Sequence, residues 1–420
     1  MRKTTQLLLL CFVSICALQA GVSFAADGAP GFVEERLDRI DATVNAEIAA
    51  GKIPGAVALI MKDGNTVYHK SFGFADLASK KPMRNDAIFR IASMTKAITS
   101  VGVMSLYERG YFKLNDPVSK FLPEFSNPQV LVSVDDDGVV TETRPASREI
   151  SIVDLLTHSS GISYPFIPSP LQKSYRQNGV IDGVTGKNIK LKEGMENLAS
   201  QPLLFDPGSK FSYGLSTDVL GRLIEVVSGK PLDEFFAQEI FTPLAMTDTA
   251  FYLPAEKGER LATLYSYVEG LKVAGGSEAS IELDNPRFPV EGARAYFSGG
   301  AGLSSTAHDY SRFIEMLLNE GELDGNRIIG RKSVELMRSP RMDMDGDGDA
   351  DFGLGFLVTT DLGESGEIGS TGTYGWGGAF ATSFWIDPEE QLIAVFMTQV
   401  APIDSDIRER FRTVVYQALE

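Results

Sequence analysis

The chain has 420 residues, of which 43% are hydrophobic, and its formal net charge at pH 7 is −17 with an isoelectric point near 4.8. This length and composition are ordinary for a globular protein with a sizeable core, built as one large domain or as two lobes. The strong negative charge argues against binding to nucleic acid or to an anionic membrane surface, and we interpret it as a solubility feature.

The first 25 residues have the pattern of a secretory signal peptide. Arg2-Lys3 precedes an apolar run from Leu7 to Leu18, which is too short to span a membrane, and Ser23-Phe24-Ala25 forms a small-x-small cleavage site. Both cysteines, Cys11 and Cys16, lie in this segment, so the mature chain would have no thiol, disulfide or cysteine metal site. We therefore expect a periplasmic or secreted protein, cleaved near Ala25, without a membrane span.

The segment after the signal peptide predicts a helix followed by a hairpin. Apolar residues from Leu37 to Ile48 recur at helical spacing, and Gly51 ends the pattern. Gly55–Met61 and Thr66–Phe72 are strand-like runs joined by a turn that contains Asp-Gly, which is a strong hairpin signal.

The next stretch contains a serine and a lysine three residues apart, Ser93 and Lys96, and no other serine of the chain has this partner. The apolar residues that follow predict a mostly buried helix from about Ser93 to Gly110, in which residues three apart share a face. A lysine desolvated by apolar surroundings can take the proton of a neighbouring serine hydroxyl and so make it nucleophilic. Since two residue types at a fixed spacing occur by chance about once in a chain of this size, the pair alone does not establish a nucleophile.

The remaining two thirds of the chain change character twice. From about 110 to 290, short helical patterns alternate with long loops, including helices near His158, from Thr217 to Ser228, and through Phe235. After Gly299 the sequence predicts a helix capped by Thr306, three strands and a final amphipathic helix. The predicted strands are Phe352–Val358, Ala379–Ile386 and Leu392–Thr398. We expect an α+β fold in which residues 26–109 and 291–420 form one lobe around an antiparallel sheet, while residues 110–290 form an inserted, mostly helical lobe.

Several further motifs occur in a fixed order along the chain. They are Leu114–Val118, Leu155–Gly161, Pro207–Leu215, Pro243–Thr249, Ser305–Tyr310 and Trp376–Ala379. Together with Ser93 and Lys96, they resemble the serine β-lactamase and penicillin-binding-protein superfamily from about residue 30 to the C-terminus. The similarity is to its class C β-lactamase branch, and most of all to family VIII carboxylesterases.

The resemblance implies a role for each matching residue. Ser93 would be the acylated nucleophile, Lys96 would share the proton transfer, and Tyr213 would be the general base or proton shuttle. The backbone N–H groups of Ser93 and Ala379 would form the oxyanion hole that stabilises the tetrahedral intermediate. Without this context, a packed aromatic residue before a helix would be the favoured interpretation of Tyr213, and the glycines before Ala379 could simply form a tight turn.

Two departures from the β-lactamase pattern bear on the substrate. Leu215 stands where β-lactamases have an asparagine, and Trp376-Gly377-Gly378 stands in place of Lys-Thr-Gly. Both changes remove polar groups that could bind a lactam, and we expect Leu215, Trp376, Gly377 and Gly378 to contact the substrate. The resemblance therefore implies an exported serine hydrolase that acts through an acyl-enzyme on short-chain esters. A β-lactamase or D-alanyl-D-alanine carboxypeptidase is the alternative enzyme, and a weakly catalytic penicillin-binding or sensing protein is the alternative of another class.

We expect no cofactor and no histidine-based metal site. His69, His158 and His308 lack the H-x-H and H-E-x-x-H spacings, and the latter two are interpreted as structural. The acidic run that contains Asp343, Asp345, Asp347 and Asp349 mimics the start of a calcium loop. Its twelfth position is Leu354 rather than glutamate, so a solvated acidic loop is the competing interpretation.

Overall fold

The computed structural model describes residues 31–274, 287–349 and 351–420. The predicted signal peptide, residues 1–25, lies outside this range. Within the described ranges, every helix is too short or too polar to cross a bilayer.

A seven-stranded antiparallel sheet forms the centre of the fold, in the order β12-β13-β14-β15-β1-β2-β3. Its strands are β1 (Gly55–Lys62), β2 (Asn65–Asp76), β3 (Lys81–Pro82), β12 (Leu357–Val358), β13 (Tyr374–Gly378), β14 (Thr382–Asp387) and β15 (Leu392–Met397). Because β1 pairs with β2 on one side and β15 on the other, the two ends of the chain share one sheet, as the sequence predicted.

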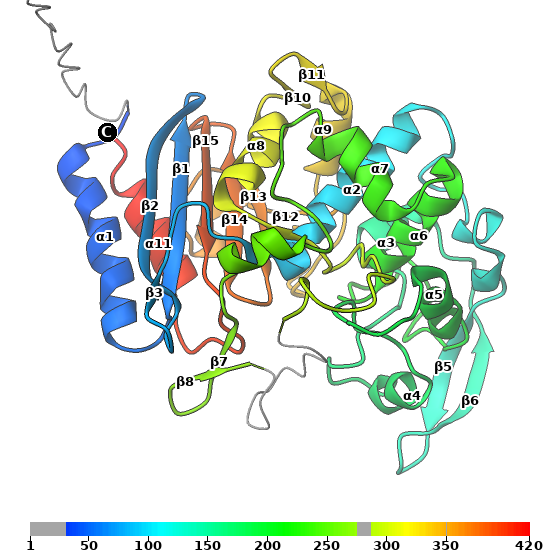
Figure 1. The fold of residues 1–420 in the computed structure, drawn as a ribbon. Coiled ribbons are helices and arrows are strands. Elements are labelled where there is room, and N and C mark those ends of the chain that lie inside the picture. Colours follow the sequence, from blue (N-terminus) through cyan, green and yellow to red (C-terminus); the bar gives the residue numbers. More distant parts are fainter. Residues whose placement is uncertain (1–30, 275–286, 350) are drawn as a thin grey trace, which may run out of the picture.

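Helices cover both faces of this sheet (Figure 1). Ala56, Ala58 and Ile60 of β1 belong to the core beneath α1 (Glu34–Ala49) and α11 (Ile407–Tyr416), while Val57 and Leu59 belong to the core beneath α8 (Ala307–Leu318). Side chains alternate between the two faces of a strand, so a strand covered on both sides must be apolar at nearly every position. This arrangement explains the uninterrupted apolar run of β1.

The rest of the chain adds helices and small hairpins beside the sheet. The helices are α2 (Thr95–Glu108), α3 (Ile152–Leu156), α4 (Gln172–Gln177), α5 (Leu191–Ala199), α6 (Ser216–Ser228), α7 (Leu232–Phe236), α9 (Arg331–Met337) and α10 (Leu362–Ser365). Short 3₁₀ turns span Ala92–Met94, Val118–Lys120, Pro123–Phe125 and Ala255–Arg260, and a π turn spans Ala237–Phe241. The two-stranded pairs are β4 (Phe89–Arg90) with β9 (Ser304–Ser305), β5 (Gln129–Val134) with β6 (Val140–Pro145), β7 (Tyr265–Tyr267) with β8 (Leu271–Val273), and β10 (Glu322–Leu323) with β11 (Asn326–Arg327). The buried helix α2 packs against α6 and so connects the helical region to the sheet.

The C-terminal strands differ from the prediction in two places. The predicted strand Phe352–Val358 is regular only at Leu357–Val358, because Gly355 adopts φ 97°, at a place where a Cβ would lie 2.3 Å from Ser100 Oγ. The predicted strand Ala379–Ile386 begins at Thr382, and the Trp376-Gly377-Gly378 motif belongs to the preceding strand, β13. The first prediction treated the run through Gly353 and Gly355 as continuous strand, whereas the second took Gly377 and Gly378 as the turn before a strand.

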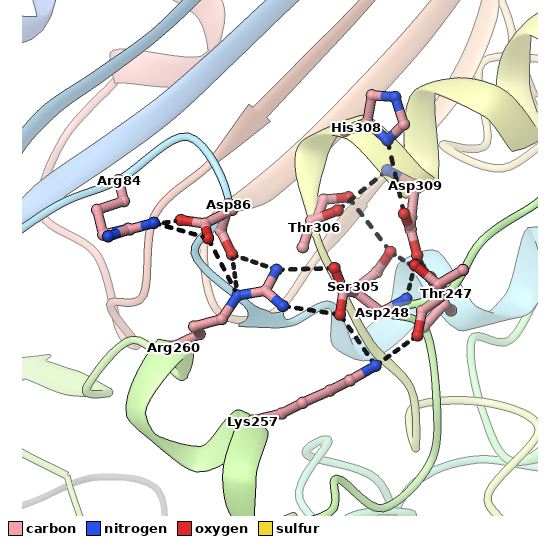
Figure 2. Close-up of polar contacts among 11 residues, drawn as sticks. Arg84, Asp86, Thr247, Asp248, Lys257, Arg260, Ser305, Thr306, His308 and Asp309 are labelled. Atoms are coloured by element: carbon pink, nitrogen blue, oxygen red, sulfur yellow. Dashed lines mark hydrogen bonds and ion pairs between the residues drawn. The ribbon is translucent and has the colours of Figure 1, made fainter. Parts of the chain in front are cut away.

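Ion pairs connect loops that are far apart in the sequence (Figure 2). Asp248 forms a bidentate pair with Arg260, at 2.8 and 2.7 Å, and its backbone N–H donates to Asp309 of α8 at 2.6 Å. The Arg260 guanidinium also donates to the backbone carbonyl of Asp86, in the loop before β4. These contacts tie the segment 247–260 to the loops around the sheet.

We expect Asp248→Asn to lower the free energy of unfolding at pH 7 by about 1–3 kcal/mol, because it removes a charge-assisted bidentate pair. The hydrogen bond from Arg260 holds the pKa of Asp248 below its usual range, and Lys257 acts in the same direction. The folded-state pKa is therefore below the unfolded one, so this stabilisation is present above about pH 4 and is lost as the pH falls through the folded-state value. Urea unfolding at pH 7 and pH 3 would measure it. The exposed pair Arg84–Asp86 supplies the control, since solvent screens it and Arg84→Gln should change the free energy of unfolding far less. Equal costs for both variants would contradict the prediction.

Candidate active site

Ser93 lies in a tight 3₁₀ turn, Ala92–Met94, immediately before α2, rather than inside the helix. Ala92 has φ 42°, a left-handed conformation that costs a non-glycine residue about 1–2 kcal/mol. The hydroxyl of Tyr310 donates to the carbonyl of Met94 at 2.9 Å, which helps to hold this turn in place. A strained backbone beside a serine hydroxyl is typical of a functional site.

Lys96 lies behind Ser93 with its amine almost completely buried. Its Nζ lies 3.2 Å from Ser93 Oγ, 2.9 Å from Tyr164 Oη and 2.8 Å from the carbonyl oxygen of Gly300. Only 2% of the residue is exposed. The predicted proximity of lysine and serine is therefore present, and the contacts with Tyr164 and Gly300 hold the amine in one position.

Tyr213 reaches the same site from the segment before α6. Its ring centre lies 4.7 Å from Lys96 Nζ, and its hydroxyl accepts a hydrogen bond from Trp376 Nε1 at 3.4 Å. A Cβ on Gly214 would lie 2.2 Å from the carbonyl oxygen of Ile162, so glycine is needed for this segment to approach so closely. The structure thus brings Ser93, Lys96 and Tyr213 together.

The Trp376-Gly377-Gly378 motif forms the end of β13, beside the Ser93 turn. A Cβ on Gly378 would lie 2.4 Å from the carbonyl oxygen of Ile91, so only glycine allows β13 to approach the turn this closely. The next residue, Ala379, follows at the groove wall, where the resemblance expects the second oxyanion donor.

A groove with a volume of about 690 Å³ opens above these residues. Its walls include Ser93, Tyr213 and the run Trp376–Ala379. Leu215, in contrast, is completely buried in the core, contrary to the expectation that it contacts the substrate. It occupies the position before α6, where its side chain packs inward.

Two residues of the site lacked a predicted role in catalysis. Tyr164 is completely buried, and burial raises its pKa well above the usual value, so the phenol that contacts Lys96 is neutral. It lies three residues after Gly161, the last residue of a matched motif, but nothing in the spacing indicated that it reaches Lys96. His158 packs on Tyr213 with ring centres 4.8 Å apart. Burial, assisted by the charge of Lys96, holds the pKa of His158 well below its usual range, so this imidazole is neutral as well.

Asp345, Asp347 and Asp349 of the acidic loop line the groove. Carboxylate oxygens of Asp343, Asp345 and Asp347 lie within 4.8 Å of one another, whereas Leu354 at the twelfth position is buried and offers no oxygen. The Asp343 carboxylate already accepts hydrogen bonds from the N–H groups of Gly346 and Gly348. A cation at this loop stays a prediction.

The beta-lactamase family model matches residues 40–418, and the chain therefore belongs to this family. The family, the fold and the relatives together define a serine hydrolase with a β-lactamase fold. Among curated relatives, esterase EstB of Burkholderia gladioli is 32% identical over 86% of this chain and 90% of its own length. Lovastatin esterase of Penicillium rubens is 31% identical over 90% of this chain and 98% of its own length.

Solved structures agree with this assignment. EstCE1, described as a hydrolase with promiscuous acyltransferase activity, superposes with a TM-score of 0.78 at 30% identity, over 91% of this chain and 99% of its own. A family VIII carboxylesterase shares the fold, with a TM-score of 0.68 at 20% identity, over 93% of this chain and 99% of its own. The superfamily and the fold class expected from the sequence motifs are confirmed.

Proposed function

We propose that this protein is a carboxylesterase that cleaves short-chain esters through an acyl-enzyme on Ser93. The observation that carries the proposal is the contact of 3.2 Å between Lys96 Nζ and Ser93 Oγ at a groove walled by Tyr213 and Trp376. Relatives described as esterases, at 31–32% identity over most of the chain, support this choice.

In the proposed reaction, Ser93 Oγ attacks the ester carbonyl and forms a tetrahedral intermediate. The hydroxyl proton passes to the Lys96–Tyr213 pair, and the backbone N–H groups of Ser93 and Ala379 stabilise the oxyanion. Collapse of the intermediate breaks the bond to the alcohol, which leaves with that proton. Water then attacks the acyl-enzyme in the same way and releases the carboxylic acid.

The charges around the groove favour an uncharged substrate. Its lining includes eight carboxylates but only two arginines, and these lie next to two of the carboxylates, in the pairs Arg412–Glu367 at 2.7 Å and Arg408–Glu409 at 3.9 Å. The negative charges repel one another. The charge of Asp349 is the largest cause of a raised pKa at Glu364, and other carboxylates of the groove act in the same direction. A penicillin or cephalosporin is an anion at neutral pH, so it would enter this groove against a negative potential. Neutral esters do not meet this barrier.

We expect p-nitrophenyl butyrate to have a kcat/KM at least tenfold above that of a cephalosporin, a difference of about 1.4 kcal/mol. Because salt screens exposed charges, added salt should raise kcat/KM for the anionic lactam and leave that of the neutral ester nearly unchanged. Steady-state kinetics with both substrates at two salt concentrations would measure these effects. A cephalosporin hydrolysed as efficiently as the ester would instead establish the β-lactamase alternative.

A matched pair of variants tests the cause of this preference. Replacement of Asp345, Asp347 and Asp349 by asparagine removes three negative charges from the groove. We expect this variant to show a smaller effect of salt on kcat/KM for the lactam. Replacement of Glu34 and Glu35 by glutamine and of Asp38 by asparagine removes three exposed charges from α1, which does not line the groove. This variant should leave kcat/KM unchanged for both the lactam and the ester. An equal response of both variants would show that net charge alone, not the groove, sets the preference.

We further propose that the protein is exported, on the basis of its N-terminal sequence pattern. Expression of the full chain in a Gram-negative host should yield a mature form that begins close to residue 26. Mass spectrometry of the periplasmic fraction measures this start, and an uncleaved cytoplasmic product would refute the proposal.

A further inference from the structure

A completely buried carboxylate, Asp218, lies on α6 close to the catalytic lysine. Asp218 is 0% exposed, and its Oδ1 accepts a hydrogen bond from Ser298 Oγ at 2.6 Å. A buried carboxylate is costly to keep in a fold unless its charge or its hydrogen bonds are used. The reaction described above gives it no role.

The hydrogen bonds around Asp218 lead to Lys96. Ser298 Oγ also accepts from the N–H of Ala301 at 3.0 Å, so Asp218 and Ser298 together hold the turn 298–301. Within this turn, the carbonyl of Gly300 accepts from Lys96 Nζ at 2.8 Å, and the carbonyl of Gly299 accepts from Thr99 Oγ1 at 2.7 Å. Both donors are on α2. The turn 298–301 therefore connects Lys96, which it binds through Gly300, with Asp218, which it binds through Ser298.

Close packing at Gly300 keeps this connection short. A Cβ at Gly300 would lie 2.4 Å from Asp218 Oδ2 and 3.2 Å from Tyr164 Oη. The second carboxylate oxygen therefore packs directly against the residue whose carbonyl binds Lys96. No side chain fits between Asp218 and Gly300, and water has little access to screen the charges of Asp218 and Lys96.

The groups that face Asp218 determine its charge. They are Lys96 of α2, Tyr164 from the loop after α3, Asp182 from the loop after α4, and Tyr296, in the loop before the turn 298–301. Burial raises the pKa of Asp218 to about 6, against the opposing effects of the Ser298 hydrogen bond and the Lys96 charge. Burial keeps both tyrosines neutral at ordinary pH by raising their pKa values well above the usual range. Lys96 is thus the cationic group among those that act on Asp218 in the described residues.

We propose that Asp218 is a positioning residue and the buried counter-charge of Lys96, which holds the amine against Ser93. This inference rests on the proposed function, in which Lys96 shares the proton transfer. Burial raises the pKa of Asp218 to about 6, so the carboxylate gains the charge that holds the amine across the acid limb of the activity profile.

The pH dependence of Ser93 acylation tests this proposal. The rate of covalent labelling by a fluorophosphonate probe and kcat/KM for p-nitrophenyl butyrate would be measured from pH 5 to 9. In Asp218→Asn, which keeps an acceptor for Ser298 but lacks the charge, the acid limb of both profiles should move to lower pH by about half a unit or more. Asp233→Asn is the matched control: Asp233 is a half-buried carboxylate on α7 whose pKa is also raised by burial, and its loss should leave both profiles in place.

A second variant separates position from charge. Ser298→Ala keeps the carboxylate but removes its hydrogen bond to the turn, so kcat should fall several-fold with KM nearly unchanged. Because the lost hydrogen bond lowers the pKa of Asp218, the acid limb should not move to lower pH as it does in Asp218→Asn. This variant also tests the link if Asp218→Asn does not fold, and an unchanged kcat in Ser298→Ala would then refute the proposal.

The outcomes that overturn the inference differ from those that overturn the proposed function. A profile of Asp218→Asn that superimposes on that of the parent refutes the role of Asp218, whatever the change in rate. An equal shift of the acid limb in Asp233→Asn also refutes the role of Asp218. A parent chain that neither labels nor hydrolyses esters refutes the proposed function itself.

Discussion

Replacement of Ser93 by alanine is expected to lower ester hydrolysis by at least about a thousandfold and to abolish covalent labelling by a fluorophosphonate. Ser93 is the serine that contacts Lys96 Nζ, and it lies on the groove wall, where a substrate carbonyl can reach its oxygen. The alanine removes one oxygen from a turn held by backbone contacts, so the thermal unfolding midpoint should stay within a few degrees of the parent. Labelling followed by mass spectrometry, together with ester turnover, would measure the loss.

A serine elsewhere on the groove supplies the control. Ser365 of α10 also lines the groove, but it lies on the exposed acidic side. Ser365→Ala should label and turn over like the parent. Ester hydrolysis that persists in Ser93→Ala would end the proposed mechanism, because no acyl-enzyme could form at the turn.

Tyr213→Phe is expected to lower kcat on the order of a hundredfold or more, which is the usual contribution of a general base. The ring packs against His158 and Trp376, and phenylalanine preserves these contacts while it removes the hydroxyl that accepts from Trp376 Nε1. Affinity for a substrate should change little, so the loss should appear in kcat rather than in KM.

Tyr164→Phe is the matched comparison, because it removes the other phenol beside Lys96. Burial keeps the Tyr164 phenol neutral, so it can orient the amine but is a poor base. Its loss should therefore cost less than the loss of the Tyr213 hydroxyl. If Tyr213→Phe reduces kcat by less than threefold, Tyr213 serves packing, and Lys96 must act alone.

The sequence predicted the sheet well where its pattern reflects local chemistry. The Asp-Gly turn between the first two strands and the β-branched run of Leu392–Thr398 gave β1, β2 and β15 to within a few residues. The strand near Phe352 was predicted too long because the prediction ran through Gly355, and β13 was missed because Gly375, Gly377 and Gly378 resemble a break before the next strand. In the fold these glycines are sites of close approach to other segments, since a Cβ at any of them would lie within 3.4 Å of another segment.

The sequence by itself determined the chemical groups of this protein and their order: a unique Ser-x-x-Lys pair, a tyrosine element and a Trp-Gly-Gly motif. Spacing along the chain sufficed to place Lys96 beside Ser93, because residues three apart share a face both in an α-helix and in the 3₁₀ turn that leads into α2. Only the tertiary structure decided which distant residues complete the site. It placed Tyr164 and Gly300 on the Lys96 amine, buried Leu215 away from the groove, and set Asp218 behind the turn that holds the lysine. Such contacts join segments up to 204 positions apart, as for Lys96 and Gly300, and their geometry follows from the packing of α2, α6 and the sheet rather than from any local pattern.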